Sequence, residues 1–418
     1  MAPDDASLTA ARKLAKPGPW SDTGSNDTLV WGKCQGSGKT PYQTSIDLNG
    51  PAFRCSCPSR KFPCKHGLAL LLLWVDGAGT IADKADAADF ASEWVTERAA
   101  RARRPVAEKT VDPVAQAKRR EDRVALMSVG MDDFSRWLGD LMRTGTAGAR
   151  NQPYSWWDGT AARLVDAQLP GLAEQVRAMG SEIHRRPDWA EHLLLSCGEW
   201  WTTTRAWLGR DRLDPAALGD LRAVLGWPYA SEEIRQSESV RDTWLTLGAH
   251  RTEDGRLHMQ RTWLWGETSH EIVQILDFAA SGQALAVPQV VGSVSEASVA
   301  RYPGTTVRRA TFVTDPVTVG ARNGLPAGRS IDEAVAFVAL ARGANPWLRR
   351  APMILTAVCA AAESVTDGAG RGLSLSGESA SWELLARSGG NPVDVFGELE
   401  GGAFRPLSVE VDGELIGL

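Results

Sequence analysis

The chain has 418 residues, of which 43% are hydrophobic and 23% are charged, and its formal net charge at pH 7 is −5. This length allows two or three domains that each bury a core. The mild negative charge argues against a protein that coats nucleic acid over its whole surface. The longest apolar run, Gly67 to Val75, is too short to span a bilayer.

Residues 1–5 lack a basic start followed by an apolar stretch, so we expect no signal peptide. Three of the six cysteines fall in one short motif and the others are widely spaced, which is typical of a reducing compartment rather than of a disulfide framework. We therefore expect a cytoplasmic protein.

Residues 1–78 are expected to form a small first domain. Gly, Ser, Asn and Asp dominate Ser21 to Asp27, so the first strand is expected only from Leu29. Asn49-Gly50 is a strong signal for a two-residue hairpin turn. The expected helices are Ser7–Lys16 and His66–Val75. The expected strands are one that begins at Leu29, one at Tyr42–Leu48 and one at Pro51–Cys55.

Residues 79–124 are rich in alanine and charged side chains, and they predict a partly helical linker broken near Pro105 and Pro113. Residues 125–235 show helical periodicity with many tryptophans and predict a mainly helical region.

Residues 236–418 turn towards strands separated by Gly-rich turns and predict a mixed, mostly antiparallel β region. The expected elements are strands at Trp244–Ala249, Leu257–Trp265, Trp382–Ala386, Val393–Phe396 and Arg405–Val411, and a helix at Asp332–Arg342. The whole chain is thus expected to be α+β, with a small zinc-stabilised hairpin–helix finger followed by a larger mixed helical and antiparallel-β region.

The clearest chemical signal is the spacing C-x-C-x6-C-x-H formed by Cys55, Cys57, Cys64 and His66. Three thiolates and one imidazole in so short a stretch indicate a closed, tetrahedral structural zinc site. Residues two apart in an extended chain point to the same side, so Cys55 and Cys57 can share one metal. Cys64 is expected at the cap of the following helix and His66 in its first turn.

All four coordination positions are then filled by protein, which leaves none for a reactive water and disfavours hydrolytic zinc chemistry. Three thiolates and one neutral imidazole around Zn²⁺ leave one negative charge. The basic residues around the ligands are expected to offset it, namely Arg54, Arg60, Lys61 and Lys65. Zinc binding of this kind contributes roughly 10–16 kcal/mol of apparent free energy, which is folding free energy for so small a segment.

The run from Cys55 to His66, after a hairpin and at the start of a helix, resembles the SWIM zinc finger, whose pattern is C-x-C-x(n)-C-x-H, and a bacterial subfamily of SWIM proteins. The resemblance covers about residues 20–78. It implies that the four motif residues bind one structural zinc ion. It also implies DNA binding or protein–protein interaction, and bacterial members often occur beside MoxR-type AAA ATPases and von Willebrand A-domain proteins.

The leading hypothesis is a non-catalytic interaction module, a protein–protein adaptor that works with such an ATPase system. Nucleic-acid binding through the finger is the alternative, since residues 1–78 hold nine Lys and Arg against six Asp and Glu. A second alternative is an enzyme with an unrecognised site in residues 125–418. We find no G-x-S-x-G or H-E-x-x-H pattern and expect no catalytic residues.

Several weaker signals have simpler interpretations. Gly36-Ser37-Gly38-Lys39-Thr40 resembles the end of a P-loop, but Pro41 and a strand follow where a phosphate-binding helix is needed, so a hairpin loop is favoured. His250 and His258 are expected across one hairpin without forming a metal site.

Tryptophans in the pairs Trp156-Trp157, Trp200-Trp201 and Trp263-x-Trp265 are interpreted as core residues rather than as a stacking surface. Cys197 and Cys359 are expected to be buried thiols, and Cys34 a free strand thiol. The helix Leu68–Val75 is apolar nearly all round, so we expect the C-terminal region, or else a partner, to cover part of it.

Overall fold

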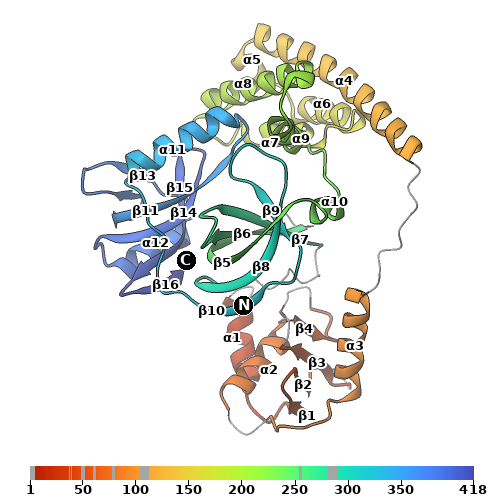
Figure 1. Cartoon of the computed structure of the whole chain (residues 1–418), viewed down its shortest axis with the longest axis vertical. Helices are drawn as coiled ribbons and strands as arrows, with labels where there is room; N and C mark the ends of the chain where they lie inside the picture. The colour runs from red at the N-terminus through yellow and green to blue at the C-terminus, as the bar shows by residue number, and fades with distance from the viewer. Residues whose placement is uncertain are drawn as a thin grey trace. The chain divides into compact units, whose positions relative to one another are not determined.

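A computed structural model describes the chain except for residues 1–4, 37, 39, 49–51, 60–62, 78–80, 104–112, 254–256 and 281–289. The chain divides into two compact units (Figure 1). Unit 1 comprises residues 1–109, 250–261 and 277–289, and unit 2 comprises residues 110–249, 262–276 and 290–418.

Unit 1 contains a four-stranded antiparallel sheet in the order β1-β2-β3-β4. Its strands are β1 (Trp20–Ser25), β2 (Leu29–Cys34), β3 (Tyr42–Asp47) and β4 (Ala52–Cys55). The last three confirm the predicted strands, and the predicted Asn49-Gly50 turn lies outside the described residues. Strand β1 was not predicted, because its sequence is rich in residues that favour turns. Its register shifts between Ser21 and Gly24, and Gly24 lies against the Trp31 ring, where a Cβ atom would not fit.

Three helices belong to unit 1, namely α1 (Asp5–Leu14), α2 (Lys65–Val75) and α3 (Asp89–Arg103). Helices α1 and α2 confirm the two predicted helices of the first domain, and α3 lies in the predicted linker. The apolar helix α2 packs against α1 and the sheet, where Leu68, Leu70 and Leu73 are buried. Part of α2 is therefore covered within unit 1, and the prediction that the C-terminal region or a partner covers another part stays a prediction. Trp74 and Val75 remain 37% and 66% exposed.

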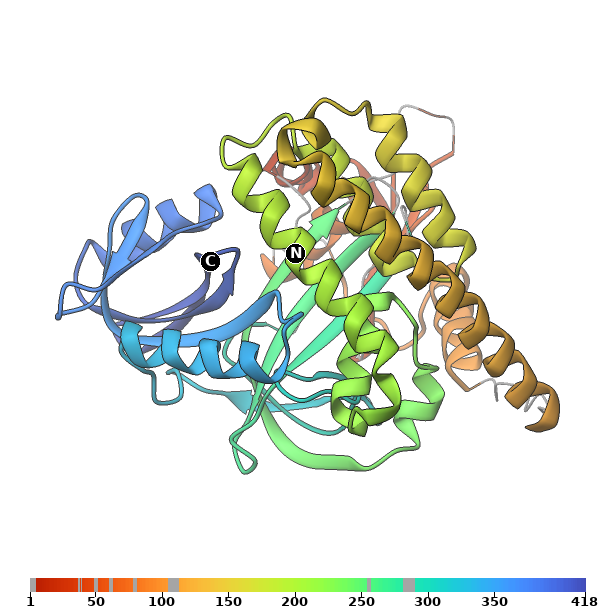
Figure 2. The same cartoon turned by 90° about the horizontal axis from the view of Figure 1, so that it is seen from above.

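Unit 2 begins with a helical bundle. Its elements are α4 (Pro113–Thr144), α5 (Thr146–Arg150), α6 (Tyr154–Asp166), α7 (Pro170–Glu182), α8 (Trp189–Leu208), a 3-10 turn (Arg210–Arg212), α9 (Pro215–Leu225) and α10 (Ser231–Arg235). This confirms the predicted helical region. Figure 2 looks onto α4 and α8, which contact each other. The bundle core includes Trp157, Trp200 and Trp207, so most of the tryptophan signal is packing.

Two six-stranded sheets follow, in the orders β10-β8-β5-β6-β7-β9 and β13-β12-β11-β14-β15-β16. The strands of the first are β5 (Ser239–Glu253), β6 (Leu257–Gly266), β7 (Ile272–Ala280), β8 (Ser293–Arg301), β9 (Arg309–Phe312) and β10 (Val317–Ala321). Those of the second are β11 (Arg350–Ala360), β12 (Ser364–Thr366), β13 (Gly372–Ser374), β14 (Val393–Glu400), β15 (Ala403–Val411) and β16 (Glu414–Gly417).

The α+β class is confirmed. Of the strand pairs whose direction the described residues define, β7–β9 is parallel and the others are antiparallel. Helix α11 (Ile331–Ala344) confirms the predicted helix, with a capping box at Ser330 and Glu333. The predicted strand Trp382–Ala386 is wrong, because it lies inside helix α12 (Glu378–Ser388). The buried residues of α12, Ser381, Leu384 and Ser388, follow a helical spacing. The five residues of the predicted strand were too few to show this spacing.

Within unit 2, polar side chains join the bundle to the β region. Asp220 of α9 is buried and accepts hydrogen bonds from the backbone N–H and the hydroxyl of Thr305, at 3.0 and 2.6 Å. The indole N–H of Trp347 donates to Thr203 of α8 at 2.8 Å. These bonds fix the loops after β8 and α11 to the helices. Among the described helices, none is both long enough and apolar enough to cross a membrane.

The contact between α7 and α9 tests the packing of the bundle. Gly171 at the start of α7 lies against the backbone of Val224 in α9, where an added Cβ atom would overlap the carbonyl oxygen. We expect Gly171→Ala to destabilise unit 2 by about 1–3 kcal/mol, because the backbone has to move apart. Gly159→Ala on α6 is the control, since open space surrounds that position. Equal melting temperatures for the two variants would contradict the close packing of these helices.

Candidate metal centre

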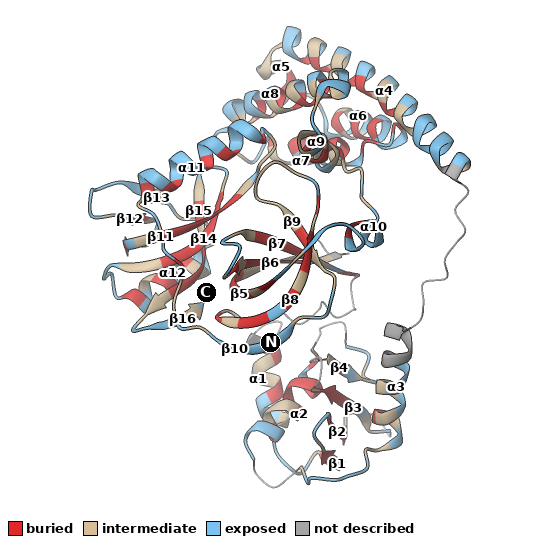
Figure 3. Ribbon diagram, in the orientation of Figure 1, coloured by how far each residue is buried: buried red, intermediate tan, exposed pale blue. Residues whose placement is uncertain are grey.

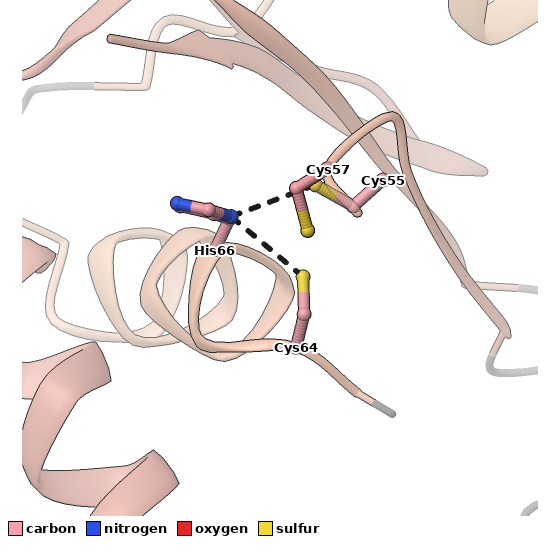
Figure 4. A group of neighbouring side chains, drawn as sticks. All are labelled: Cys55, Cys57, Cys64 and His66. Carbon is pink, nitrogen blue, oxygen red and sulfur yellow. Dashed lines mark hydrogen bonds between the residues drawn. The ribbon is translucent and has the colours of Figure 1, made fainter. Parts of the chain in front are cut away.

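A strand end and a helix start bring four metal-binding side chains together (Figure 4). Cys55 is the last residue of β4 and Cys57 lies two residues further on. Cys64 occupies the N-cap of α2, with extended backbone angles, and His66 lies in the first turn. The predicted arrangement of two donors from an extended segment and two from a helix start is therefore present.

The distances between the donor atoms fit one zinc ion. The Cys55 and Cys64 sulfur atoms lie 3.7 and 3.9 Å from Nδ1 of His66, and all four donor atoms lie within 4.8 Å of one another. Zn–S and Zn–N bonds of about 2.3 and 2.0 Å at a tetrahedral angle separate sulfur from nitrogen by about 3.6 Å. The cluster suits a structural zinc ion with little movement of its side chains.

The surroundings of the cluster orient two of its members. The hydroxyl of Thr44 donates a hydrogen bond to the Cys55 sulfur at 3.4 Å. The Tyr42 ring packs against the His66 ring with 5.0 Å between their centroids. Cys64 and His66 are buried, whereas Cys55 and Cys57 are half-buried. Cys64 and His66 thus lie deeper in the domain than Cys55 and Cys57.

The thiols of the cluster lie close enough to shift one another's pKa. The pKa of Cys64 falls to about 3, chiefly because the Cys55 thiol donates a hydrogen bond to it. Hydrogen bonds from His66 and from the backbone N–H of Gly67 act in the same direction. The pKa of Cys55 rises because it is that donor, and burial raises the pKa of Cys57. A divalent cation would take the place of the protons that the thiols otherwise share.

The structure describes two of the four basic residues that were predicted to offset the negative charge of the zinc site. Arg54 and Lys65 are exposed next to ligand positions, while Arg60 and Lys61 lie outside the described residues. Cys34 is a buried free thiol at the end of β2, as expected for a strand thiol. Burial raises its pKa to about 11, and the positive charge of Lys65 partly opposes this rise.

The weaker metal-binding candidates form no second metal centre among the described residues. Among the described residues, the four-residue cluster is the one group of three or more His, Cys, Asp or Glu side chains with metal-binding geometry. His250 and His258 lie on the neighbouring strands β5 and β6. The residues expected to form a hairpin loop around Gly38 do connect β2 to the antiparallel β3, although Ser37 and Lys39 lie outside the described residues.

The remaining cysteines and the tryptophan pairs divide by exposure. Cys197 is buried as predicted, but Cys359 is only half-buried, because the side chains of β11 alternate between two faces. In the tryptophan pairs, Trp157, Trp200 and Trp263 are core residues, whereas Trp201 is largely exposed. The interpretation of all pair members as core residues is therefore wrong for Trp201.

Unit 2 contains a cavity of about 780 Å³ that sequence reasoning did not find, because its walls come from distant segments. It lies between α7, α9 and the loops at residues 302–309 and 345–350. Burial raises the pKa of Asp220 and of Tyr229 in its wall. The Asp220 carboxylate is already engaged by Thr305, and neither histidine nor cysteine is among the described residues that line the cavity.

Comparison with known families gives two matches. Residues 43–74 match the SWIM zinc finger, and residues 120–225 match the SWIM-associated four-helix bundle domain. The first match includes all four residues of the cluster. The second runs from α4 to the end of α9, a region for which the sequence predicted helices but no family. No curated protein and no solved structure shows a significant match to the chain.

The closed geometry predicts about one zinc ion per purified chain and its loss in Cys57→Ser. Without the metal, the strand end and the helix start separate, so Leu68 to Val75 should become accessible to protease. Metal analysis and limited proteolysis check this. Cys359→Ser is the control, since it removes another half-buried free thiol outside the cluster. Unchanged zinc content in Cys57→Ser would show that Cys57 is not a ligand.

The hydrogen bond from Thr44 predicts a smaller effect. Thr44→Val keeps the shape of the side chain and removes the donor to the Cys55 sulfur, so zinc affinity should fall about tenfold. Competition with a chromogenic chelator measures this change. Ser45→Ala is the matched control on the same strand, because its buried hydroxyl has no hydrogen-bond partner among the described residues. Equal zinc affinities in the two variants would exclude a role for Thr44.

Proposed function

The chain is a SWIM-type zinc finger domain protein, and we propose that it acts as a non-catalytic protein-interaction module. The observation that carries this proposal is the geometry of α2, which begins with two of the cluster residues and ends with exposed Trp74 and Val75. A zinc ion bound by Cys55, Cys57, Cys64 and His66 would fix this helix against the sheet and thereby hold its apolar end in place.

The donor set supports a non-catalytic role for the ion. Three thiolates and one imidazole complete a tetrahedral shell, so the ion would have no open position at which to activate water. In the cavity of unit 2, the burial of Asp220 serves the hydrogen bonds to Thr305 that attach a loop to the bundle. Burial raises the pKa of Asp220 and these hydrogen bonds oppose the rise, and because the carboxylate is already engaged we assign it no catalytic role.

The exposed end of α2 favours a protein over a nucleic acid as the partner. Trp74 and Val75 offer apolar surface next to the acidic Asp76, which is unsuited to a phosphate backbone. The exposed basic residues Arg54 and Lys65 support nucleic-acid binding as the second candidate. On the resemblance to bacterial SWIM proteins, we propose a MoxR-type ATPase or its von Willebrand A-domain companion as the partner. The six free cysteines support a cytoplasmic location.

Capture from cell extract tests the protein partner. Tagged wild-type protein should retain an ATPase or a von Willebrand A-domain protein, and the purified partner should bind again in isolation. Val75→Asp should weaken this binding at least tenfold with unchanged zinc content, because a charge would be buried at the interface. Val317→Asp is the control, since Val317 is 62% exposed on β10. Equal partner binding by both variants would contradict the role of α2.

Titration with duplex DNA separates the second candidate from the first. Tight binding at low salt that weakens steeply at moderate salt would favour a nucleic-acid partner and overturn the proposal. We expect only weak DNA binding, with no difference between wild-type protein and Val75→Asp.

A further inference from the structure

An apolar seam lies along the exposed side of helix α8, opposite to its buried residues. Figure 3 shows by colour which positions of the helix are buried and which are exposed. The large apolar members of the seam are Leu194, Leu195, Trp201 and Leu208, which are between 49% and 62% exposed. Leu194, Trp201 and Leu208 are spaced seven residues apart. The remaining seam positions are Glu191, Gly198 and Arg205, which repeat at the same interval and are also exposed. We call these seven residues the α8 seam.

The spacing of the α8 seam is that of a coiled-coil surface rather than of scattered exposed side chains. Two sets of positions offset by three residues, each repeating every seven residues, form the contact line between two paired helices. From Glu191 to Arg205 and Leu208, the seam extends over about 25 Å at a rise of 1.5 Å per residue. The inward face of the same helix is already occupied by the bundle core, including Leu193 and Trp200.

We propose that the α8 seam is a two-fold symmetric interface at which a second copy of this chain binds with its α8 antiparallel. In this register, Trp201 of one copy lies opposite Gly198 of the other. An added Cβ atom at Gly198 has no neighbour within 4 Å, so the space above this glycine is open to an indole ring. A small residue opposite a large one allows the two helices to approach closely.

The charges of the seam agree with the antiparallel direction. The same register brings Glu191 of one copy within one helical turn of Arg205 of the other, and symmetry repeats the pair at the other end. A parallel arrangement would instead place each of these residues next to its own copy, with like charges together. Arg205 also lies over the Trp201 ring, 5.8 Å from its centroid, so this arginine is already held along the seam.

Gly198→Leu is the most direct test of the interface. The monomer has room for the larger side chain, and leucine favours a helix more than glycine does. In the dimer, however, it would fill the space opposite Trp201. We expect wild-type protein to dimerise in sedimentation equilibrium and Gly198→Leu to weaken dimerisation at least tenfold, with unchanged helical circular dichroism. Gly159→Leu is the control, since Gly159 is equally open and its neighbours one turn away, Ser155 and Arg163, are polar.

Charge exchange tests the direction of pairing. Glu191→Arg and Arg205→Glu should each weaken dimerisation about tenfold, because each creates like charges, and the double variant should return to within about threefold of wild type. Trp201→Glu should abolish dimerisation, whereas Trp382→Glu, at a tryptophan 54% exposed on α12, should not. A wild-type monomer throughout the micromolar range would overturn the proposal. A dimer insensitive to Gly198→Leu, or one not restored by the double charge exchange, would also overturn it.

Discussion

The organisation of the first domain depends on the meeting of one strand end and one helix start at four donor atoms. Strand β4 and helix α2 are joined by a segment with few apolar side chains, and the contact of Phe53 with Gly67 is the packing that brings their ends together. The Cys55 and Cys64 sulfur atoms lie 3.7 and 3.9 Å from Nδ1 of His66, so a bound metal ion would add a second constraint that holds the two ends together. A zinc ion there would contribute roughly 10–16 kcal/mol, comparable to the whole stability of a small domain.

Cys64 and His66 have different surroundings because they occupy different positions at the start of α2. Cys64 occupies the N-cap, where the start of a helix favours a thiolate. His66, two residues later, lies under the Tyr42 ring and directs Nδ1 towards the sulfur atoms. Gly67 then permits close contact with Phe53, whose ring lies 3.1 Å from where a Cβ atom would be. Ligand geometry and core packing thus share the first turn of one helix.

The sequence predicted those features that depend on local spacing. The cluster, the strands β2 to β4 and the helix α2 follow from residue periodicity and ligand order within about thirty residues. It could not predict β1, where Gly24 is explained only by the Trp31 ring of the neighbouring strand. Nor could it predict that α1 covers α2, because the contact joins segments about fifty residues apart. The cavity wall at Asp220 depends on Thr305 in a distant loop, which no local pattern indicates.

The helix glycines are of two kinds: close packing requires some of them, and others lie at an open surface. A glycine inside a helix costs about 1 kcal/mol relative to alanine. A helix glycine is therefore explained where it makes a close contact that a larger residue would prevent. Gly180 has that contact, since the Trp157 ring occupies the space of a Cβ atom, and Gly171 meets the backbone of α9. In the part of the chain that the structure describes, Gly198 has no such neighbour, yet Leu194 and Trp201 flank it on the same exposed face. Exposed apolar side chains around an open glycine are costly for an isolated helix and favourable only when another helix covers them, which is why the α8 seam points outside the single chain.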